Sequence, residues 1–230
     1  RNLIAKFKYK INLIEINNFT NKQEIVQILN CKAEVVIFDT LRTSLQTLKK
    51  IRPKKKFIVG FDELGKGYIF FDCLIYSLVQ PLIKRKYIFS GYKYLNLSNK
   101  IIKKTKINKS VKNVVISLGG NDKRNISIKI LKALFSIKKK VNFHFLLREE
   151  DYLNLKNYLI KNNLIKNNIL IYKNTSDYYK IASKADIGIV SGGLTLFEFA
   201  SMGVPTISIP QHHHQLINIR KLQKLQITKL

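Results

Sequence analysis

The sequence predicts an α/β protein built from two Rossmann-type domains, each with a parallel sheet. Short apolar runs of strand length alternate with longer amphipathic runs, as they do in successive βαβ units. Hydrophobic residues make up 46% of the 230 residues, which is enough for packed cores and too much for a disordered chain. The most apolar stretches, such as Val204–Pro210, are strand-sized, and none is long enough to cross a bilayer.

Residues 1–110 are expected to form an N-terminal Rossmann-like domain and the interdomain connection. The expected elements are strands at Ile11–Ile16, Val35–Phe38, Phe57–Val59 and Cys73–Ser77 and helices at Lys22–Leu29 and Thr43–Ile51. Pro53 follows the second helix and cannot continue it. The segment from about Pro81 to Ser110 is rich in Lys, Tyr and Asn, which is typical of a connection between domains.

Residues 111–230 are expected to form a C-terminal Rossmann-like domain. The expected strands are Val114–Leu118, Val141–Leu147, Ile169–Tyr172, Ile187–Val190 and Thr206–Ile209. The expected helices are Ile126–Lys139, Glu149–Lys161, Asp177–Lys184 with Ser176 as its N-cap, Thr195–Met202, and one from about Gln215. Alternation of this kind predicts a doubly wound parallel sheet, whose ligands bind beyond the carboxyl ends of the strands.

The formal net charge of +28 raises the question of a nucleic-acid partner. Residues 1–110 hold 23 Lys and Arg against 7 Asp and Glu, and residues 111–230 hold 19 against 7. Because the excess is spread over both halves, we interpret it as a compositional bias of the surface. No specific nucleic acid is expected, although the positive field favours anionic ligands such as diphosphates.

The loop after the first strand of the second domain is a candidate ligand-binding loop. It reads Gly119, Gly120, Asn121 and Asp122. Glycines let the backbone approach a ligand, and the following helix start offers free N–H groups to an anion. The same glycine pair is equally compatible with a simple turn.

A stronger pattern follows the strand at Ile187–Val190. Ser191, Gly192, Gly193 and Thr195 form a glycine turn that runs directly into a helix start, where N–H groups and hydroxyls suit a diphosphate. Glu198 comes about one turn into the helix, where a carboxylate is able to accept hydrogen bonds from both hydroxyls of a ribose. The alternative is a capping box formed by Thr195 and Glu198, which needs no ligand.

The third loop contains His212, His213 and His214, with Gln215 and Asn218 after it. Adjacent histidine side chains diverge, and no second cluster completes a coordination shell, so no metal site is predicted. A polar loop that faces a ligand is the preferred interpretation. His144 lies in an alternating strand and is interpreted as structural.

The run from Ala185 to Glu198, followed by Gly203-Val204-Pro205, Pro210, Gln215 and Asn218, resembles the C-terminal domain of GT-B sugar-nucleotide enzymes. The peptidoglycan N-acetylglucosaminyltransferase family shares this general pattern. The chain is more similar to the UDP-sugar hydrolase family of pseudaminic acid biosynthesis and its spore-coat polysaccharide relatives. That family opens its second domain with a strand and Gly-Gly-x-Asp, as Val115 to Asp122 do here. Its first domain has an apolar strand that ends in Asp, like Val35–Asp39, and a later strand that ends in two acids, like Phe61-Asp62-Glu63. A tyrosine-containing segment before its linker is similar to Gly91–Leu95.

The resemblance implies a GT-B-like fold in which Ser191, Gly192, Gly193 and Thr195 face the diphosphate. It also implies that Glu198 faces the ribose and that Gln215 and Asn218 line the sugar side. The family's N-terminal domain begins with a strand, a glycine-rich loop and a histidine assigned to the chemistry. This sequence has no such segment, so its N-terminal domain is expected to lack the first βα unit, and the catalytic group is not identified.

The leading hypothesis is therefore a UDP-sugar hydrolase in surface polysaccharide or nonulosonic acid biosynthesis, in which water displaces UDP and frees a deoxy-amino sugar. A glycosyltransferase with the same donor site and a non-catalytic sugar-nucleotide-binding module are the alternatives. The hydrolysis needs a general base, which lies either outside this sequence or on an acidic residue such as Asp39 or Asp62. Neither of these two residues is preferred. The expected partner is a UDP-sugar, no cofactor or metal is needed, and no transmembrane segment is predicted. Two cysteines that suit free buried thiols favour the cytoplasm.

Overall fold

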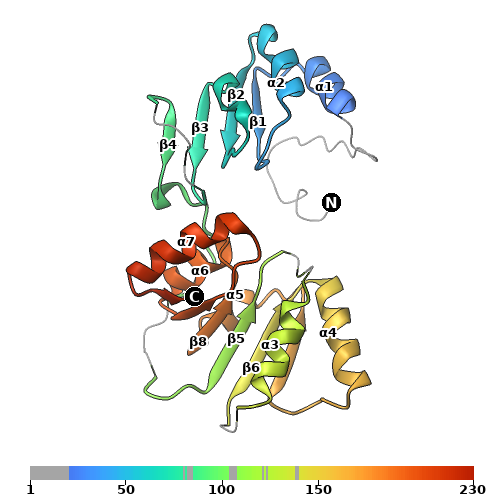
Figure 1. The fold of residues 1–230 in the computed structure, drawn as a ribbon, viewed down its shortest axis with the longest axis vertical. Helices are drawn as coiled ribbons and strands as arrows, with labels where there is room; N and C mark the ends of the chain where they lie inside the picture. The colour runs from blue at the N-terminus through green and yellow to red at the C-terminus, as the bar shows by residue number, and fades with distance from the viewer. Residues whose placement is uncertain are drawn as a thin grey trace. The chain divides into compact units, whose positions relative to one another are not determined.

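The computed structural model describes residues 21–79, 81, 85–103, 108–120, 122, 124–137 and 140–230. The chain divides into two compact units, Arg1–Tyr94 and Leu95–Leu230, each with its own sheet (Figure 1). The division falls inside the segment from Pro81 to Ser110 that was expected to connect the domains. The expected strand Ile11–Ile16 lies outside the described residues.

The first unit contains a four-stranded parallel sheet in the order β1-β2-β3-β4. Its strands are β1 (Val35–Phe38), β2 (Phe57–Phe61), β3 (Cys73–Tyr76) and β4 (Ile88–Ser90). Its helices are α1 (Asn21–Asn30) and α2 (Leu45–Ile51), with short 3-10 helices η2 (Arg52–Lys54), η3 (Lys66–Phe70) and η4 (Tyr92–Tyr94). The core is formed by Phe38, Leu48, Ile51, Ile58, Phe71, Leu74, Tyr76 and Val79.

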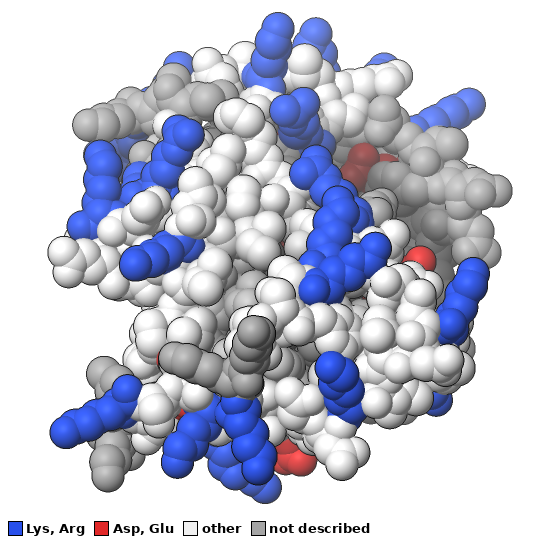
Figure 2. All heavy atoms as spheres, turned by 60° about the horizontal axis from the view of Figure 1, so that its bottom comes forward, with Lys and Arg blue, Asp and Glu red and all other residues white. Residues whose placement is uncertain are grey.

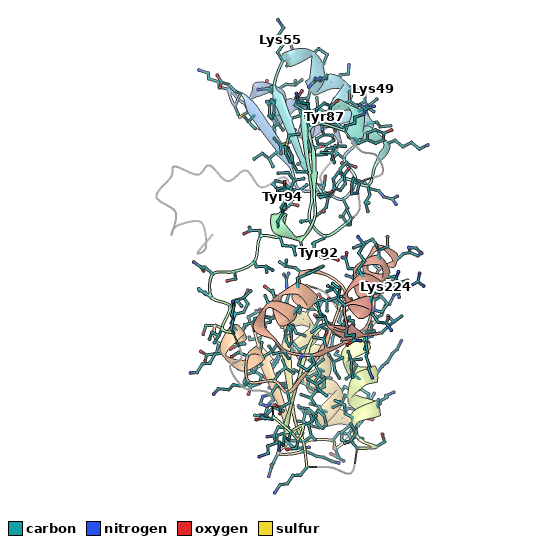
Figure 3. The ribbon with its side chains drawn as sticks, turned by 90° about the vertical axis from the view of Figure 1, so that its left-hand side faces the viewer. Lys49, Lys55, Tyr87, Tyr92, Tyr94 and Lys224 are labelled. Atoms are coloured by element: carbon teal, nitrogen blue, oxygen red, sulfur yellow. The ribbon has the colours of Figure 1, made fainter. Side chains whose placement is uncertain are left out.

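The first unit follows the predicted order of elements, with β4 as an addition. Ser44 is the N-cap of α2, and its hydroxyl accepts a hydrogen bond from the Thr47 N–H at 3.4 Å. β4 lies in the segment from Pro81 to Ser110, which was expected only to connect the domains. Beyond it, Tyr92 and Tyr94 lie on η4 (Figure 3), and the Tyr94 ring meets Phe89 edge-on at 5.9 Å between centroids. Both cysteines are free, as predicted, but neither is buried: Cys31 is exposed and Cys73 is half-buried.

Asp72 links η2 to β2 in the first unit. The Arg52 guanidinium donates to both carboxylate oxygens at 2.6 Å, and the Ile58 N–H donates to Oδ2 at 2.8 Å. Burial raises the pKa of Asp72, but Arg52 and the Ile58 N–H outweigh it, so the pKa is lowered overall. A carboxyl group with a lowered folded-state pKa stabilises the fold above its unfolded pKa and loses that contribution as the pH falls.

We therefore expect Asp72→Asn to destabilise the first unit at pH 7 by up to about 1 kcal/mol, since the pair is partly exposed. The difference from the unchanged protein should shrink as the pH falls from about 4, where the unfolded-state carboxyl becomes protonated, through the lower folded-state pKa. Urea unfolding between pH 7 and pH 3 measures it. Asp39→Asn at an exposed position is the control, and a difference that stays constant with pH would contradict the assignment.

The second unit contains a six-stranded parallel sheet in the order β10-β9-β8-β5-β6-β7. Its strands are β5 (Asn113–Ser117), β6 (Asn142–Leu147), β7 (Ile169–Lys173), β8 (Ile187–Val190), β9 (Thr206–Ser208) and β10 (Thr228–Lys229). Its helices are α3 (Ile126–Leu134), α4 (Glu149–Lys161), α5 (Tyr178–Ala182), α6 (Leu194–Met202) and α7 (His213–Lys224). Buried residues of β5, β6, β8, α3 and α4 share one apolar core, centred on residues such as Ile116, Phe145 and Leu155.

Three expectations for the second unit are corrected. The helix from Ile126 ends at Leu134, because the next N–H groups, of Ser136 and Ile137, bond only three residues back. The N-cap of α5 is Asp177 rather than Ser176, and its side chain makes no capping bond. A sixth strand, β10, pairs with β9, and it was missed because two residues carry no periodic pattern.

Candidate ligand site at the carboxyl edge of the second sheet

The strand order places a topological switch point between β5 and β8. The chain runs from β5 through β6 to β7 on one side, and then returns to β8 on the other side of β5. The loops after β5 and β8 therefore leave the sheet in opposite directions, and ligands of open parallel sheets bind at such a point. Most of the residues predicted to bind a ligand lie in these two loops.

Gly119 brings the β5 loop against the β8 loop. Its φ is +86°, a left-handed conformation that favours glycine. A Cβ atom at this position would lie 3.3 Å from the Ser191 Oγ and 3.8 Å from the Thr195 Oγ1. The structure thus places the hydroxyl groups of Ser191 and Thr195 beside Gly119 in the loop after β5.

The start of α6 has no side-chain cap. Its N-cap is Gly193, in extended conformation, and no side chain bonds the first N–H groups there. Thr195 is the second residue of the helix, and its hydroxyl bonds Tyr178 instead. The capping-box alternative is therefore wrong. The Leu196 N–H bonds the Gly193 carbonyl at 3.1 Å, and the positive end of α6 still favours an anion.

Glu198 is buried in the first turns of α6, 9% exposed. Its Oε1 accepts a hydrogen bond from the Tyr179 hydroxyl at 2.7 Å. Burial is the main cause that raises the pKa of Tyr179, and the bond to Glu198 raises it further, so this hydroxyl keeps its proton at neutral pH. Burial also raises the pKa of Tyr178, whose hydroxyl lies 3.1 Å from the Ser117 Oγ.

The beginning of α7 packs onto the glycine turn. The Asn218 Nδ2 donates to the Gly192 carbonyl at 3.3 Å, and the Gln215 Oε1 accepts from the Gln211 N–H at 2.8 Å. The Gln215 Nε2 lies 3.6 Å from the position that a Cβ on Gly193 would take. Gln215 and Asn218, both buried, are thus brought to the turn, with Asn218 bonded to its backbone.

Gln211 is a member of this group that the sequence prediction missed. It is buried, and its Nε2 donates to the Leu118 carbonyl at 2.5 Å, which joins the β9 loop to the β5 loop. The available signal was its place directly after Pro210 at the end of a strand.

Asp122 does not face the turn. Its Oδ1 accepts from the Ile126 N–H at 2.7 Å, and its Oδ2 accepts from the N–H and hydroxyl of Ser127 at 2.7 and 2.6 Å. The carboxylate therefore satisfies the start of α3, and both oxygens are occupied within the protein. Asn121 lies outside the described residues.

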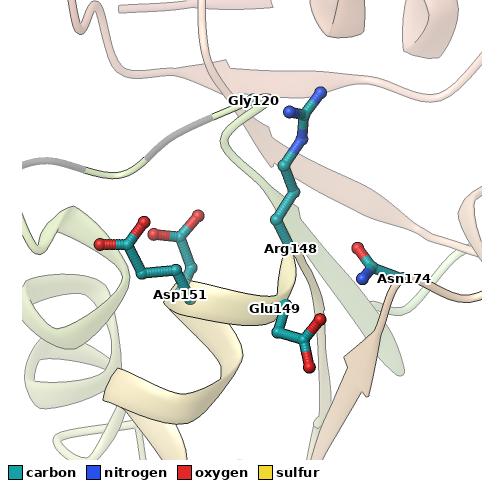
Figure 4. A pocket seen from close by; sticks show the side chains of 6 residues that line it. Gly120, Arg148, Glu149, Asp151 and Asn174 are labelled. Atoms are coloured by element: carbon teal, nitrogen blue, oxygen red, sulfur yellow. The ribbon is translucent and has the colours of Figure 1, made fainter. Parts of the chain in front are cut away.

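A cavity of about 440 Å³ opens beside Gly120 on the same edge of the sheet. It is lined by Gly120, Arg148, Glu149, Glu150, Asp151 and Asn174. In Figure 4 the Arg148 side chain points toward Gly120, and its Nη2 lies 3.4 Å from the position of a Cβ there. Arg148 follows β6 directly, and sequence analysis did not single it out.

The acids and histidines considered for chemistry have mostly structural partners. Asp62 Oδ1 accepts from the N–H groups of Ser77, Leu78 and Val79, and its Oδ2 accepts from the Ser77 hydroxyl. This full set of partners argues against Asp62 as a general base. Asp39 is exposed. No candidate base emerges from these positions.

The histidines show no metal-binding arrangement. The rings of His212 and His214 stack at 5.5 Å, and no group of three metal-ligating side chains occurs in the part of the chain that the structure describes. His144 stacks on Tyr172 at 5.9 Å, with its Nδ1 3.2 Å from the Tyr172 hydroxyl. Burial lowers the pKa of His144, and these contacts agree with a structural role.

Figure 2 shows Lys and Arg scattered over the face in view, with few acidic side chains among them. Among the described residues, no helix combines the length and apolar character that a membrane span requires.

Comparison with known families and structures agrees with the resemblance seen in the sequence. Residues 99–229 match the model of the glycosyltransferase family 28 C-terminal domain. The uncharacterized protein MJ1062 of Methanocaldococcus jannaschii is 31% identical over 228 residues, which cover 89% of this chain and 47% of that protein. The spore coat polysaccharide biosynthesis protein SpsG of Bacillus subtilis is 25% identical over 202 residues, covering 82% of this chain and 59% of that protein. The chain thus spans about half of the length of these relatives.

Two solved structures share the fold. MurG of Acinetobacter baumannii aligns with a TM-score of 0.58 at 14% identity, covering 91% of this chain and 62% of that one. MnaA of S. aureus, solved with UDP, aligns with a TM-score of 0.61 at 12% identity, covering 98% and 70%. The predicted GT-B-like fold with two parallel-sheet units is confirmed.

Proposed function

Because this chain belongs to the glycosyltransferase family 28 C-terminal domain family through residues 99–229, we propose that it binds a UDP-sugar as part of a polysaccharide-biosynthesis enzyme. The observation that carries the proposal is the meeting of Gly119, Ser191 and Thr195 at the uncapped start of α6, with Glu198 one turn further on. A nucleotide-sugar presents a diphosphate, which suits the helix end, and a ribose diol, which suits a carboxylate acceptor.

In this proposal the diphosphate lies at the positive end of α6. The N–H groups of the first turn and the hydroxyls of Ser191 and Thr195 donate to its oxygens. Glu198 accepts from the ribose hydroxyls, and Gln215 and Asn218 line the sugar side. In the loop after β5, Gly119 and Gly120 approach the diphosphate, and Asn121 is proposed to bind the nucleotide-sugar with them. Asp122 contributes indirectly, since it holds the start of α3.

The proposed reaction breaks the bond between the anomeric carbon and the β-phosphate oxygen, and UDP leaves with the bonding electrons. The helix end stabilises the charge that develops on the departing diphosphate. The acceptor oxygen forms the new bond to the anomeric carbon, and its proton passes to a general base. The acceptor is either water, as in the hydrolase family that the sequence resembles, or an alcohol, which the glycosyltransferase family match favours. The name of the Bacillus relative supports a role in polysaccharide biosynthesis. UDP is chosen from the sequence resemblance, and the UDP bound to MnaA agrees with it.

Binding and turnover are tested separately. Calorimetric titration should show that UDP binds and that UMP, which lacks the β-phosphate, binds at least about 10-fold more weakly, because it loses charge-assisted hydrogen bonds. UDP release from UDP-linked amino sugars, without and with alcohol acceptors, then distinguishes hydrolysis from transfer. Binding without release in either assay would favour the non-catalytic module. Failure of UDP to bind at millimolar concentration would reject the proposed site.

A further inference from the structure

A chain of three hydroxyl and carboxylate groups leads from residue 98 to Glu198. The Ser98 Oγ accepts from the Lys100 N–H at 3.2 Å, and the Ser98 side chain hydrogen-bonds Tyr179. The Tyr179 hydroxyl in turn lies 2.7 Å from the Glu198 Oε1. Ser98 belongs to the segment that opens the second unit, and Tyr179 lies on α5.

The direction of donation along this chain is determined by chemistry. A carboxylate only accepts, so the Tyr179 hydroxyl donates its proton to Glu198. The Tyr179 oxygen is then open to accept from Ser98, whose own oxygen is engaged by the Lys100 N–H. In this order Ser98 donates to Tyr179, and Tyr179 donates to Glu198.

The position of Tyr179 is held by its neighbour. The Tyr178 hydroxyl contacts Ser117 at the end of β5 and Thr195 on α6, and thus ties α5 to both sides of the switch point. The Tyr178 and Tyr179 rings meet edge-on, with centroids 5.0 Å apart. α5 has only five residues and no side-chain cap, so these contacts set its orientation.

Glu198 therefore carries one engaged oxygen and one that remains for a ligand. Oε1 accepts the hydrogen bond from Tyr179, and Oε2 makes no side-chain hydrogen bond within the part of the chain that the structure describes. A glutamate held at one oxygen loses less conformational freedom when a ligand binds to the other.

We propose that Tyr179 is a positioning residue that orients the Glu198 carboxylate toward the two ribose hydroxyls of the nucleotide. This role rests on the proposed function of the site. It gives the site a preference for ribose over deoxyribose nucleotides that depends on the Tyr179 hydroxyl. Ser98 supports the arrangement from the segment that opens the second unit.

The test compares Tyr179→Phe, which removes one oxygen, with Tyr172→Phe, which removes a hydroxyl that contacts only His144 among the recorded bonds. Dissociation constants for UDP and 2′-deoxy-UDP are measured by calorimetry for both variants and for the unchanged protein. We expect Tyr179→Phe to lower the affinity for UDP by about 3- to 10-fold and the affinity for 2′-deoxy-UDP by a smaller factor. Tyr172→Phe should match the unchanged protein. In a Glu198→Ala background, Tyr179→Phe should have no further effect.

The outcomes separate the two proposals. If the unchanged protein does not bind UDP, both the proposed function and the positioning role of Tyr179 are rejected. If UDP binds and Glu198→Ala weakens it while Tyr179→Phe does not, only the positioning role is rejected. The positioning role would also be rejected if Tyr179→Phe weakened the binding of both nucleotides equally or made UDP bind more tightly. The same holds if Tyr179→Phe had its full effect in the Glu198→Ala background. Each result would show that the Tyr179 hydroxyl does not act through Glu198.

Discussion

Glu198→Ala is expected to weaken UDP binding by about 10- to 150-fold, which corresponds to the roughly 1.5–3 kcal/mol of a hydrogen bond to a charged group. Glu198 is nearly buried, one turn inside α6 and behind the Ser191-Gly192-Gly193 turn. A carboxylate in this position has little competition from water, so the loss of its bonds to a ribose is not replaced by solvent.

Glu198→Gln serves as the graded variant, because it keeps the volume and one acceptor oxygen but removes the charge. Its affinity should lie between those of Glu198→Ala and the unchanged protein. Calorimetry with UDP and 2′-deoxy-UDP provides the measurement, and the two nucleotides should bind Glu198→Ala with similar constants. A full ribose preference in Glu198→Ala would place the ribose elsewhere.

Gly192→Ala is expected to lower the free energy of unfolding of the second unit by about 1–3 kcal/mol, the usual cost of overpacking. The added Cβ would lie 2.7 Å from the Gln215 Cβ, 2.8 Å from the Ile219 Cδ1 and 2.9 Å from the Gln215 carbonyl oxygen. The carbonyl belongs to the backbone of α7, so the helix itself has to shift. UDP binding should fall as well, because the bond from Asn218 to the Gly192 carbonyl would be disturbed.

Gly193→Ala is the matched control, one residue further along the same turn. Its φ is −91°, and its nearest neighbour would be the Gln215 Nε2 at 3.6 Å, so alanine fits without displacement. Denaturant unfolding followed by circular dichroism should separate the two variants clearly. Equal stability of Gly192→Ala and Gly193→Ala would show that the turn and α7 are not packed as described.

Much of the second unit was predictable from local pattern. The bounds of α4 and β8 agree with the expectation residue for residue, because acidic residues open α4 and a short apolar run defines β8. The end of α3, the cap of α5 and the two short strands β4 and β10 were not predictable. The end of α3 and the cap of α5 depend on local backbone geometry that the apolar pattern does not show, and β4 and β10 have too few residues for a periodic signal.

The sequence by itself determined the fold class and the kind of ligand to look for, because a glycine turn between a strand and a helix is a local pattern. Only the tertiary structure decided what each polar residue of that pattern contacts. It assigned Asp122 to the start of α3, removed Thr195 from a capping role and joined Glu198 to Tyr179. It also brought Gln211 and Arg148 to the same edge of the sheet. These partners come from separate strands and helices, and parallel crossover connections bring their ends together only when the sheet has formed.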